Sequence, residues 1–105
     1  MEDYIIVFVT AASIEDGEKI GNALVEEKLA ACTNIIKGLT SIYTWKKKLC
    51  KDEEVLLLIK TRIEKFDKLA KRVKELHSYD VPEIIALPIV NGSKDYLNWV
   101  DESLS

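Results

Sequence analysis

The sequence is poor in the residues that most catalytic and metal centres require. Its 105 residues include one histidine, His77, and two cysteines, Cys32 and Cys50. They form neither an HExxH nor a CxxC motif, and the four glycines never fall at the spacing of a phosphate-binding loop. These absences exclude the common signatures of hydrolases and of nucleotide-dependent enzymes. We therefore expect a protein that is not an enzyme and that carries no organic cofactor.

Charge and hydropathy exclude further classes of protein. The 15 Lys and Arg residues against 18 Asp and Glu residues give a net charge of −3, whereas nucleic-acid binders normally show a basic excess. The longest apolar runs, residues 4–9 and 55–59, are far shorter than the roughly 20 residues of a membrane span. The start of the sequence is acidic, unlike a signal peptide, and two cysteines are too few for a disulfide framework. We expect a cytoplasmic protein with reduced thiols, no nucleic-acid partner and no membrane partner.

Apolar residues recur at strand or helix spacing along the whole sequence, without linkers or repeats between the segments. Ser13 with Asp16 three residues later indicates the start of a helix, and Ser93 is placed to cap a last helix. The order of segments predicts one α+β domain over residues 1–105, a ferredoxin-like βαββαβ sandwich followed by a short C-terminal helix. The predicted elements are a strand over 4–10, a helix after Ser13, strands over 31–45 and 54–60 joined by a turn over 46–52, a helix over 66–76, a strand over 83–90, and a helix after Ser93.

Two features concern the edges of this sheet. Pro88 lies within the last strand and has no N–H to donate, so we expect this strand at an edge or at a bulge. The outer part of the long strand pair, residues 40–55, would extend beyond the helices that cover the sheet. Aromatic strands left uncovered in this way favour contact with another subunit. The sequence therefore predicts a homo-oligomer.

His77 lies in the part of the sequence that is richest in candidate ligands. Tyr79, Asp80 and Glu83 follow it within six residues. An imidazole with carboxylates, joined by a thiolate such as Cys32 from elsewhere, would suit a divalent metal ion. The simpler interpretation is that His77 hydrogen-bonds the end of the preceding helix. The sequence leaves both open.

Other candidate residues also have two interpretations each. Cys32 flanks an alternating strand and is either a buried inert thiol or a ligand. Cys50 lies among lysines that would favour its reactive thiolate form, unless it is an exposed thiol without a role. Lys60 ends a buried strand and either extends to solvent or holds an anionic ligand in a cleft between subunits. The aromatic residues suit either interface packing or a ligand cleft; they are Tyr43, Trp45, Tyr79, Tyr96 and Trp99.

Several motifs occur together in one order along the sequence. They are EKLAACTNI at 27–35, SIYTW at 41–45, IKT at 59–61, HSYDVPEI at 77–84 and YLNW at 96–99. Through them the sequence closely resembles the CutA family of divalent-cation-tolerance proteins over essentially its whole length. The resemblance implies ferredoxin-like subunits in a tight homotrimer, similar to that of the PII signalling proteins, whose small ligands lie between subunits. It also implies a role in tolerance of copper and other divalent metals, with no enzymatic reaction attached.

The residues that match the family pattern can be carried over one by one; they are Cys32, Lys60, His77, Tyr79, Pro82, Glu83, Tyr96 and Trp99. Bacterial members proposed to bind copper have a cysteine in the first strand and a histidine pair after the second helix. This sequence has Val9 and Leu76–His77 at those positions, so one thiolate and one imidazole are missing.

The resemblance therefore implies weak divalent-metal binding, with Cu²⁺ as the first candidate and with His77, Glu83 and Cys32 as ligands. The alternative is a PII-like signalling protein that binds a small anion or nucleotide in the cleft between subunits. In that alternative, Lys60 and the aromatic residues provide the site; they are Tyr43, Trp45, Tyr79, Tyr96 and Trp99.

Overall fold

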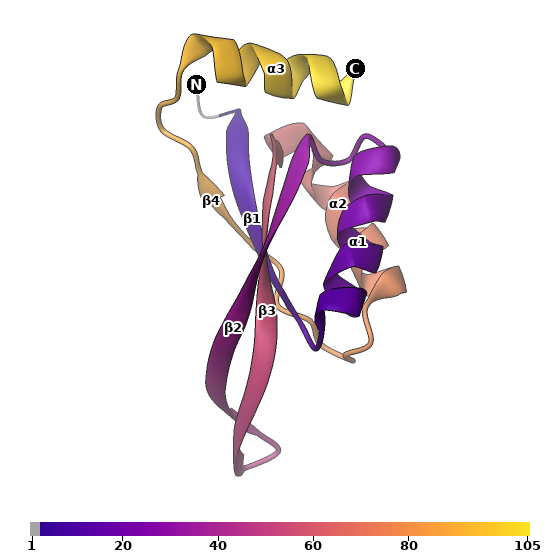
Figure 1. Ribbon diagram of the computed structural model, residues 1–105, viewed down its shortest axis with the longest axis vertical. Coiled ribbons are helices and arrows are strands. Elements are labelled where there is room, and N and C mark those ends of the chain that lie inside the picture. The colour runs from indigo at the N-terminus through magenta and orange to yellow at the C-terminus, as the bar shows by residue number, and fades with distance from the viewer. Residues whose placement is uncertain (1–2) are drawn as a thin grey trace.

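The computed structural model, which describes residues 3–105, has its helices and strands in the order that the sequence predicts. They are β1 (Tyr4–Ala11), α1 (Ile14–Glu26), β2 (Cys32–Trp45), β3 (Lys48–Arg62), the short 3₁₀ turn η1 (Ile63–Lys65), α2 (Phe66–Leu76), β4 (Ile85–Pro88) and α3 (Lys94–Leu104). The strands form one sheet in the order β2-β3-β1-β4, and every neighbouring pair is antiparallel. Helices α1 and α2 lie against one face of it (Figure 1). This confirms the ferredoxin-like α+β fold with a C-terminal helix.

Local signals in the sequence set the helix ends. The Ser13 hydroxyl accepts a hydrogen bond from the Asp16 N–H at 3.1 Å, and the Ser93 hydroxyl accepts one from the Tyr96 N–H at 3.3 Å. Helix α2 ends at His77, whose N–H donates to the Val73 carbonyl at 2.8 Å. Pro88 lies in β4, which is an edge strand of the sheet. These four expectations are confirmed. The two caps and the end of α2 depend on residues within four positions of one another, and the edge position of β4 agrees with the missing N–H of Pro88.

Two predicted boundaries are wrong. The turn of the β2–β3 hairpin contains only Lys46 and Lys47, both with positive φ, at 53° and 68°. A two-residue turn of this kind matches the twist of the strands, so the tract from Lys48 onward belongs to β3 and its lysines lie on an exposed strand. Strand β4 is also shorter than predicted, because β1 offers it partners only over residues 5–8.

The face of the sheet that carries α1 and α2 holds the main core. Alternate residues of β1 and β3 point into it, and each is at most 3% exposed. Burial of such a side chain contributes about 1.5–3 kcal/mol to stability. Gly17 of α1 allows close approach to the sheet, since a Cβ there would lie 3.1 Å from the Leu57 side chain. The core residues are Ile5, Val7, Val9, Leu57 and Ile59 from the sheet, Ile20, Leu24, Leu69 and Val73 from the helices, and Ala30 from the loop after α1.

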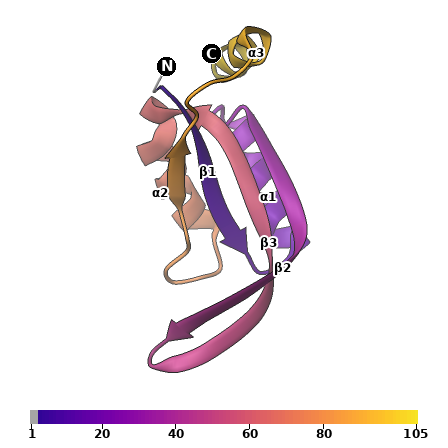
Figure 2. The ribbon, with the colours of Figure 1, turned by 90° about the vertical axis from the view of Figure 1, so that its left-hand side faces the viewer.

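The opposite face of the sheet is not covered by α1 or α2, which lie behind the sheet in Figure 2. Its apolar residues are defined by the register, since partners across antiparallel strands share a face. Three of them are 47–52% exposed: Ile36, Ile85 and Leu87. We call this surface the open face; it consists of Ile6, Phe8, Ile36, Leu56, Leu58, Ile85 and Leu87. Helix α3 lies near one end of the sheet, and the β2–β3 hairpin projects beyond the helices at the other (Figures 1 and 2).

A bulge in β2 determines which way the hairpin aromatics point. The β2–β3 register shifts by one residue between Ile36 and Leu39, where Gly38 has a φ of +81°. An extra residue in one strand exchanges the two faces for everything beyond it. Tyr43 and Trp45 therefore share the face of Glu54, the side of the sheet that carries the open face. Within residues 3–105, no helix is long and apolar enough to cross a membrane.

Candidate functional site

A pocket of about 530 Å³ lies where the projecting hairpin leaves the rest of the sheet. Its walls come from β1, β2, β3 and the loop between α2 and β4. Three of its residues are carboxylates, and no Lys or Arg lines it. We call it the carboxylate pocket; it is lined by Glu54, Asp80 and Glu83, by Tyr43, Trp45 and Tyr79, and by Thr10, Ser41, Ile42 and Val81.

Glu54 is the most buried of the three carboxylates, at 8% exposure. One of its oxygens accepts a hydrogen bond from the Tyr79 hydroxyl at 2.6 Å. Burial, and secondly this bond to Glu54, raise the pKa of the Tyr79 phenol above its usual value. Tyr79 therefore remains a neutral donor at physiological pH, so it contributes no negative charge to the site.

Tyr43 makes an equivalent contact on the hairpin. Its hydroxyl donates to the Asp52 carboxylate. This hydrogen bond, more than burial, raises the pKa of Tyr43 to about 12. Both phenols of the pocket thus direct their protons at carboxylates and keep their ring faces for other contacts.

His77 connects the pocket loop to β1. Its Nδ1 accepts a hydrogen bond from the Tyr79 N–H at 3.1 Å, and its Nε2 lies 2.7 Å from the Thr10 carbonyl oxygen. With Nδ1 as the acceptor, Nε2 is the ring nitrogen placed to donate to the Thr10 carbonyl. It also lies against the Tyr79 ring, with 4.6 Å between centroids. Since both ring nitrogens are engaged, a metal ion would have to displace one of these bonds to bind His77.

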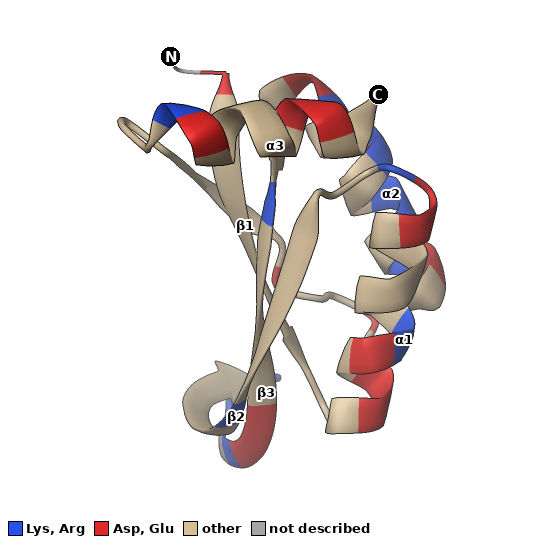
Figure 3. Cartoon of the chain, turned by 45° about the horizontal axis from the view of Figure 1, so that its top comes forward, with Lys and Arg blue, Asp and Glu red and all other residues tan. Residues whose placement is uncertain are grey.

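In the described part of the chain, the pocket carboxylates have no cationic partner within 4 Å. Among residues 3–105, every ion pair within 4 Å involves Arg62 or Arg72, and none includes Glu54, Asp80 or Glu83. The hairpin carries basic and acidic residues close together (Figure 3). Lys48 and Lys51 are the cross-strand partners of Trp45 and Ile42, but neither lysine is among the residues that line the pocket. Within residues 3–105, the carboxylates of the pocket are therefore not held in ion pairs.

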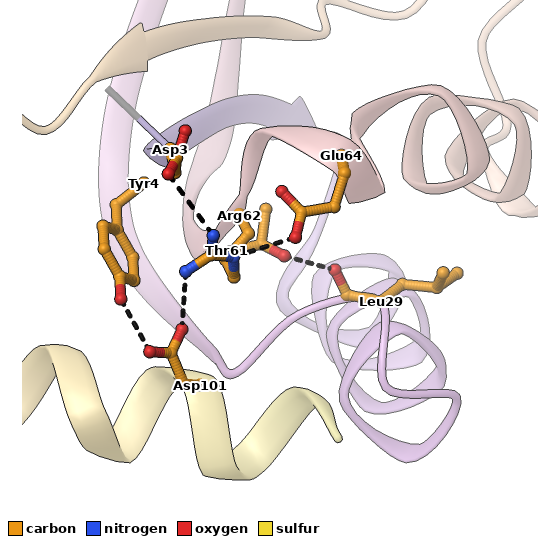
Figure 4. Close-up of polar contacts among 7 residues, drawn as sticks. All are labelled: Asp3, Tyr4, Leu29, Thr61, Arg62, Glu64 and Asp101. Carbon is orange, nitrogen blue, oxygen red and sulfur yellow. Dashed lines mark hydrogen bonds and ion pairs between the residues drawn. The ribbon is translucent and has the colours of Figure 1, made fainter. Parts of the chain in front are cut away.

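The charges around Arg62, at the α3 end of the sheet, are by contrast mutually paired (Figure 4). The Arg62 guanidinium contacts Asp101 at 2.8 Å, Glu64 at 2.9 Å and Asp3 at 3.5 Å. Tyr4 donates to Asp101 at 2.7 Å, and its ring lies 4.8 Å from the guanidinium carbon. Hydrogen bonds to Glu64 and Asp101 raise the pKa of Arg62 further above its already high value. This network fastens α3 to the sheet.

The remaining predicted site residues also lie at the α3 end. Cys32 pairs with Lys60 across β2 and β3, and the Lys60 ammonium donates to the Asn34 side-chain oxygen. The Cys32 thiol lies 3.7 Å from that same oxygen. Burial, and secondly the nearby Cys32, raise the pKa of Tyr96. Tyr96 stands 5.5 Å from the Trp99 ring on α3, centroid to centroid.

The structure therefore divides the predicted site residues into two groups. Glu83, Tyr43, Trp45 and Tyr79 share the carboxylate pocket, and His77 adjoins it through Tyr79. Cys32, Lys60, Tyr96 and Trp99 lie at the opposite end of the sheet. The predicted trio of His77, Glu83 and Cys32 is not brought together within one chain, and residues 3–105 contain no cluster of three or more His, Cys, Asp or Glu able to hold a metal ion.

Glu54 is the pocket residue that sequence reasoning missed. It stands at the charged end of an apolar strand, where a solvated side chain is the ordinary expectation. The available signal was Gly38, because a glycine inside a strand suggests a bulge. A bulge there brings Glu54 onto the face of Tyr43 and Trp45, as the register shows.

Comparison with known proteins places this chain among closely similar sequences. Residues 5–103 match the sequence model of the family described as CutA1 divalent ion tolerance protein. The chain is 53% identical over 98 residues to the divalent-cation tolerance protein CutA of Thermus thermophilus, covering 93% of this chain and 95% of that protein. It is 50% identical over 99 residues to the chloroplastic protein CutA of Arabidopsis thaliana, covering 94% of this chain but only 54% of that protein. A crystal structure of CutA1 from Oryza sativa superposes with a TM-score of 0.95 at 46% identity, covering 98% of this chain and 94% of that one.

Proposed function

Because the chain belongs to the CutA1 divalent ion tolerance family, we propose that it binds a divalent cation weakly and that the carboxylate pocket holds the ion. One observation carries this proposal: Glu54, Asp80 and Glu83 line one pocket to which no Lys or Arg of residues 3–105 contributes. Since residues 3–105 contain no cluster of three such side chains that could coordinate one ion together, the ion would keep water ligands and bind weakly. Like charges that share a partly desolvated site repel one another, and a bound cation relieves that repulsion. The family names describe tolerance proteins, and we propose a role in tolerance without catalysis.

Copper is the first ion to consider at this site. For a given set of oxygen and nitrogen ligands, Cu²⁺ generally binds more tightly than the other divalent first-row metals. Carboxylate and phenol oxygens without a thiolate make a weak copper site, so other divalent ions should follow copper in the usual order. His77 would add a nitrogen ligand only by giving up its bond to the Tyr79 N–H, which makes its contribution to affinity smaller than that of the carboxylates.

The test is calorimetric titration of Cu²⁺, Zn²⁺ and Mn²⁺ into metal-stripped protein. Glu54→Gln and Glu83→Gln should each weaken Cu²⁺ binding about tenfold, which corresponds to about 1.4 kcal/mol. Glu53→Gln is the matched control, because Glu53 is exposed and on the other face of β3. Binding that is lost in Cys32→Ser but unchanged in Glu54→Gln and Glu83→Gln would overturn the placement of the ion in the pocket.

We also propose that three copies of the chain assemble through the open face. Exposed apolar side chains in one continuous patch favour an interface, and Ile36, Ile85 and Leu87 are each about half exposed in the single chain. Analytical ultracentrifugation should give three times the 11.9 kDa mass of the chain. Ile36→Lys should dissociate the assembly, whereas Val25→Lys on the outer surface of α1 should not.

The compartment that we propose is the cytoplasm. Cys32 and Cys50 are both free thiols, and cytosolic reducing systems keep thiols in that state. Fractionation of cells that express the native chain tests this, with recovery in a membrane or periplasmic fraction as the contrary result.

A second candidate function rests on Lys60. Within residues 3–105 its ammonium group has a neutral partner, Asn34, and no carboxylate within 4 Å. This favours a PII-like role in which a small anion or nucleotide binds near Lys60, Tyr96 and Trp99. ATP or phosphate would then raise the melting temperature in proportion to the logarithm of concentration above Kd, and Lys60→Ala would abolish the shift.

A further inference from the structure

The carboxylate pocket has more apolar surface than a metal ion can use. In the single chain, Trp45 and Tyr43 line it while remaining 45% and 41% exposed, and Ile42 and Val81 are 66% and 70% exposed. Its volume of about 530 Å³ lies in the range of small-molecule sites. A divalent ion with six waters would occupy roughly 180 Å³, taking about 30 Å³ for each water. Much of the pocket would then contribute nothing to holding the ion.

The negative charge of the pocket is also spread out rather than focused. Glu54 belongs to β3, whereas Asp80 and Glu83 belong to the loop before β4. In residues 3–105 these carboxylates do not form a three-ligand metal cluster. In the pocket, apolar and aromatic surface lies between the carboxylates. A complementary ligand has positive charges that are separated by a hydrocarbon chain.

The hydrogen-bonding groups point to the same kind of ligand. The Tyr79 and Tyr43 hydroxyl protons are already donated to Glu54 and Asp52. An ionised carboxylate accepts hydrogen bonds and donates none, so these side chains suit a ligand that donates hydrogen bonds. An ammonium group offers three donors and no acceptor, and it is also attracted to the faces of Trp and Tyr rings.

We propose that the carboxylate pocket binds an aliphatic polyamine, a chain of methylene groups with a primary ammonium group at each end. One ammonium group donates to Glu54, the other donates to Glu83 or Asp80, and the methylene chain packs on Trp45. This inference shares the pocket with the proposed metal site but does not require that a metal binds.

The experiment is calorimetric titration of spermidine and of putrescine (1,4-diaminobutane) into metal-free protein at low ionic strength. Three compounds of similar length distinguish the effect of ligand charge from that of ligand shape. Putrescine carries two positive charges, n-butylamine carries one, and 1,4-butanediol carries none. We expect saturable binding that is tightest for spermidine, at least about tenfold weaker for n-butylamine, and absent for the diol. Equal binding of the diol, or no saturable heat from spermidine, would overturn the proposal.

Variants locate the site. Glu83→Gln, which alters an exposed side chain, and Glu54→Gln should each weaken spermidine binding about tenfold. Trp45→Leu keeps an apolar side chain but removes the aromatic ring, and it should weaken spermidine binding about threefold. Trp45→Phe keeps a ring and should bind spermidine almost as tightly as the unchanged protein. Glu53→Gln should bind as the unchanged protein does, and equal losses in Glu53→Gln and Glu83→Gln would show non-specific attraction and overturn the proposal.

Copper titrated separately into the same variants distinguishes the two uses of the pocket. Spermidine binding without copper binding would leave the polyamine proposal standing and remove the metal proposal. Copper binding without spermidine binding would overturn the polyamine proposal and leave the metal proposal standing. If both bind, saturating spermidine should weaken Cu²⁺ binding, because both need Glu54 and Glu83; undiminished Cu²⁺ affinity would contradict a polyamine in the pocket.

Discussion

The charges around Arg62, at the α3 end of the sheet, and those of the carboxylate pocket, at the hairpin end, differ in how they are paired. At the α3 end, Arg62 contacts three carboxylates and the ring of Tyr4. At the hairpin end, Glu54 and Glu83 share a pocket with no basic side chain. Charges that neutralise one another hold the fold together, whereas charges left without a partner are available to a ligand. The ion pairs of Arg62 hold α3 to the sheet, and the unpaired carboxylates are the reason that we propose binding at the hairpin end.

The two ends differ in packing as well. Leu97, Val100 and Leu104 of α3 are each at most 7% exposed, in a small core with Tyr4 and Ala31. At the hairpin end, Tyr43 and Trp45 keep more than two-fifths of their surface exposed. Substitutions at the first end should therefore change stability, and substitutions at the second should change binding.

The largest expected effect is that of Leu97→Ala at the α3 end. Removing a buried leucine side chain leaves a cavity, and the free energy of unfolding should fall by about 2–4 kcal/mol. Urea denaturation measures this. Leu49→Ala on the hairpin, where the side chain is 79% exposed, should change it by less than about 0.5 kcal/mol. A lower Cu²⁺ affinity of the folded Leu97→Ala protein would contradict the claim that the α3 end affects stability and not binding.

The next effect is that of Gly38→Ala at the hairpin bulge. Gly38 has a φ of +81° and no atom near an added Cβ, so the cost is backbone strain alone, about 1 kcal/mol. Because this bulge directs Tyr43 and Trp45 toward Glu54, cation affinity should fall with stability. Lys37→Ala is the neighbouring control, and it should leave the affinity unchanged. A Gly38→Ala protein with full affinity would show that the bulge does not position the pocket.

A smaller effect is expected for Arg62→Lys. The lysine keeps the positive charge but cannot contact Asp3, Glu64 and Asp101 together. The partners are partly exposed, so the loss of unfolding free energy should be about 1 kcal/mol. In high salt, the difference in unfolding free energy between Arg62→Lys and the unchanged protein should become smaller. A difference that does not change with salt would exclude an electrostatic origin.

The smallest effect is a pH dependence of the α3 end. The hydrogen bond from Tyr4, and then that from Arg62, hold the pKa of Asp101 below its usual value of 3.8. A carboxyl whose pKa is lowered by folding stabilises the protein fully above the pKa of the unfolded chain. That contribution is lost as the pH falls through the lower folded value. Stability measured from about pH 5 to about pH 2 should therefore fall less steeply in Asp101→Asn. Asp95→Asn, on the same helix, should follow the unchanged protein, and parallel slopes for Asp101→Asn would refute the assignment.

The sequence predicts local features of this fold better than distant contacts. Ser13 and Ser93 cap their helices as expected, because a cap involves residues three positions apart. The predicted position of the hairpin turn is wrong, because a lysine-rich tract is as compatible with an exposed strand as with a loop. The separation of Cys32 from His77 follows from the length of β2, 14 residues, and its register with β3. The contact of Glu54 with Tyr79 joins residues 25 positions apart, and no pattern of neighbouring residues predicts it.

The most direct test uses the two tryptophans, since Trp45 lies at the pocket and Trp99 lies on α3. Cu²⁺ quenches the fluorescence of a nearby indole. In the Trp99→Phe protein, which keeps Trp45, we predict saturable quenching by Cu²⁺ that Glu83→Gln weakens about tenfold. In the Trp45→Phe protein, which keeps Trp99, we predict no saturable quenching. Saturable quenching of Trp99 with an unaffected Trp45 would place the ion near Cys32 and contradict the assignment of binding to the hairpin end.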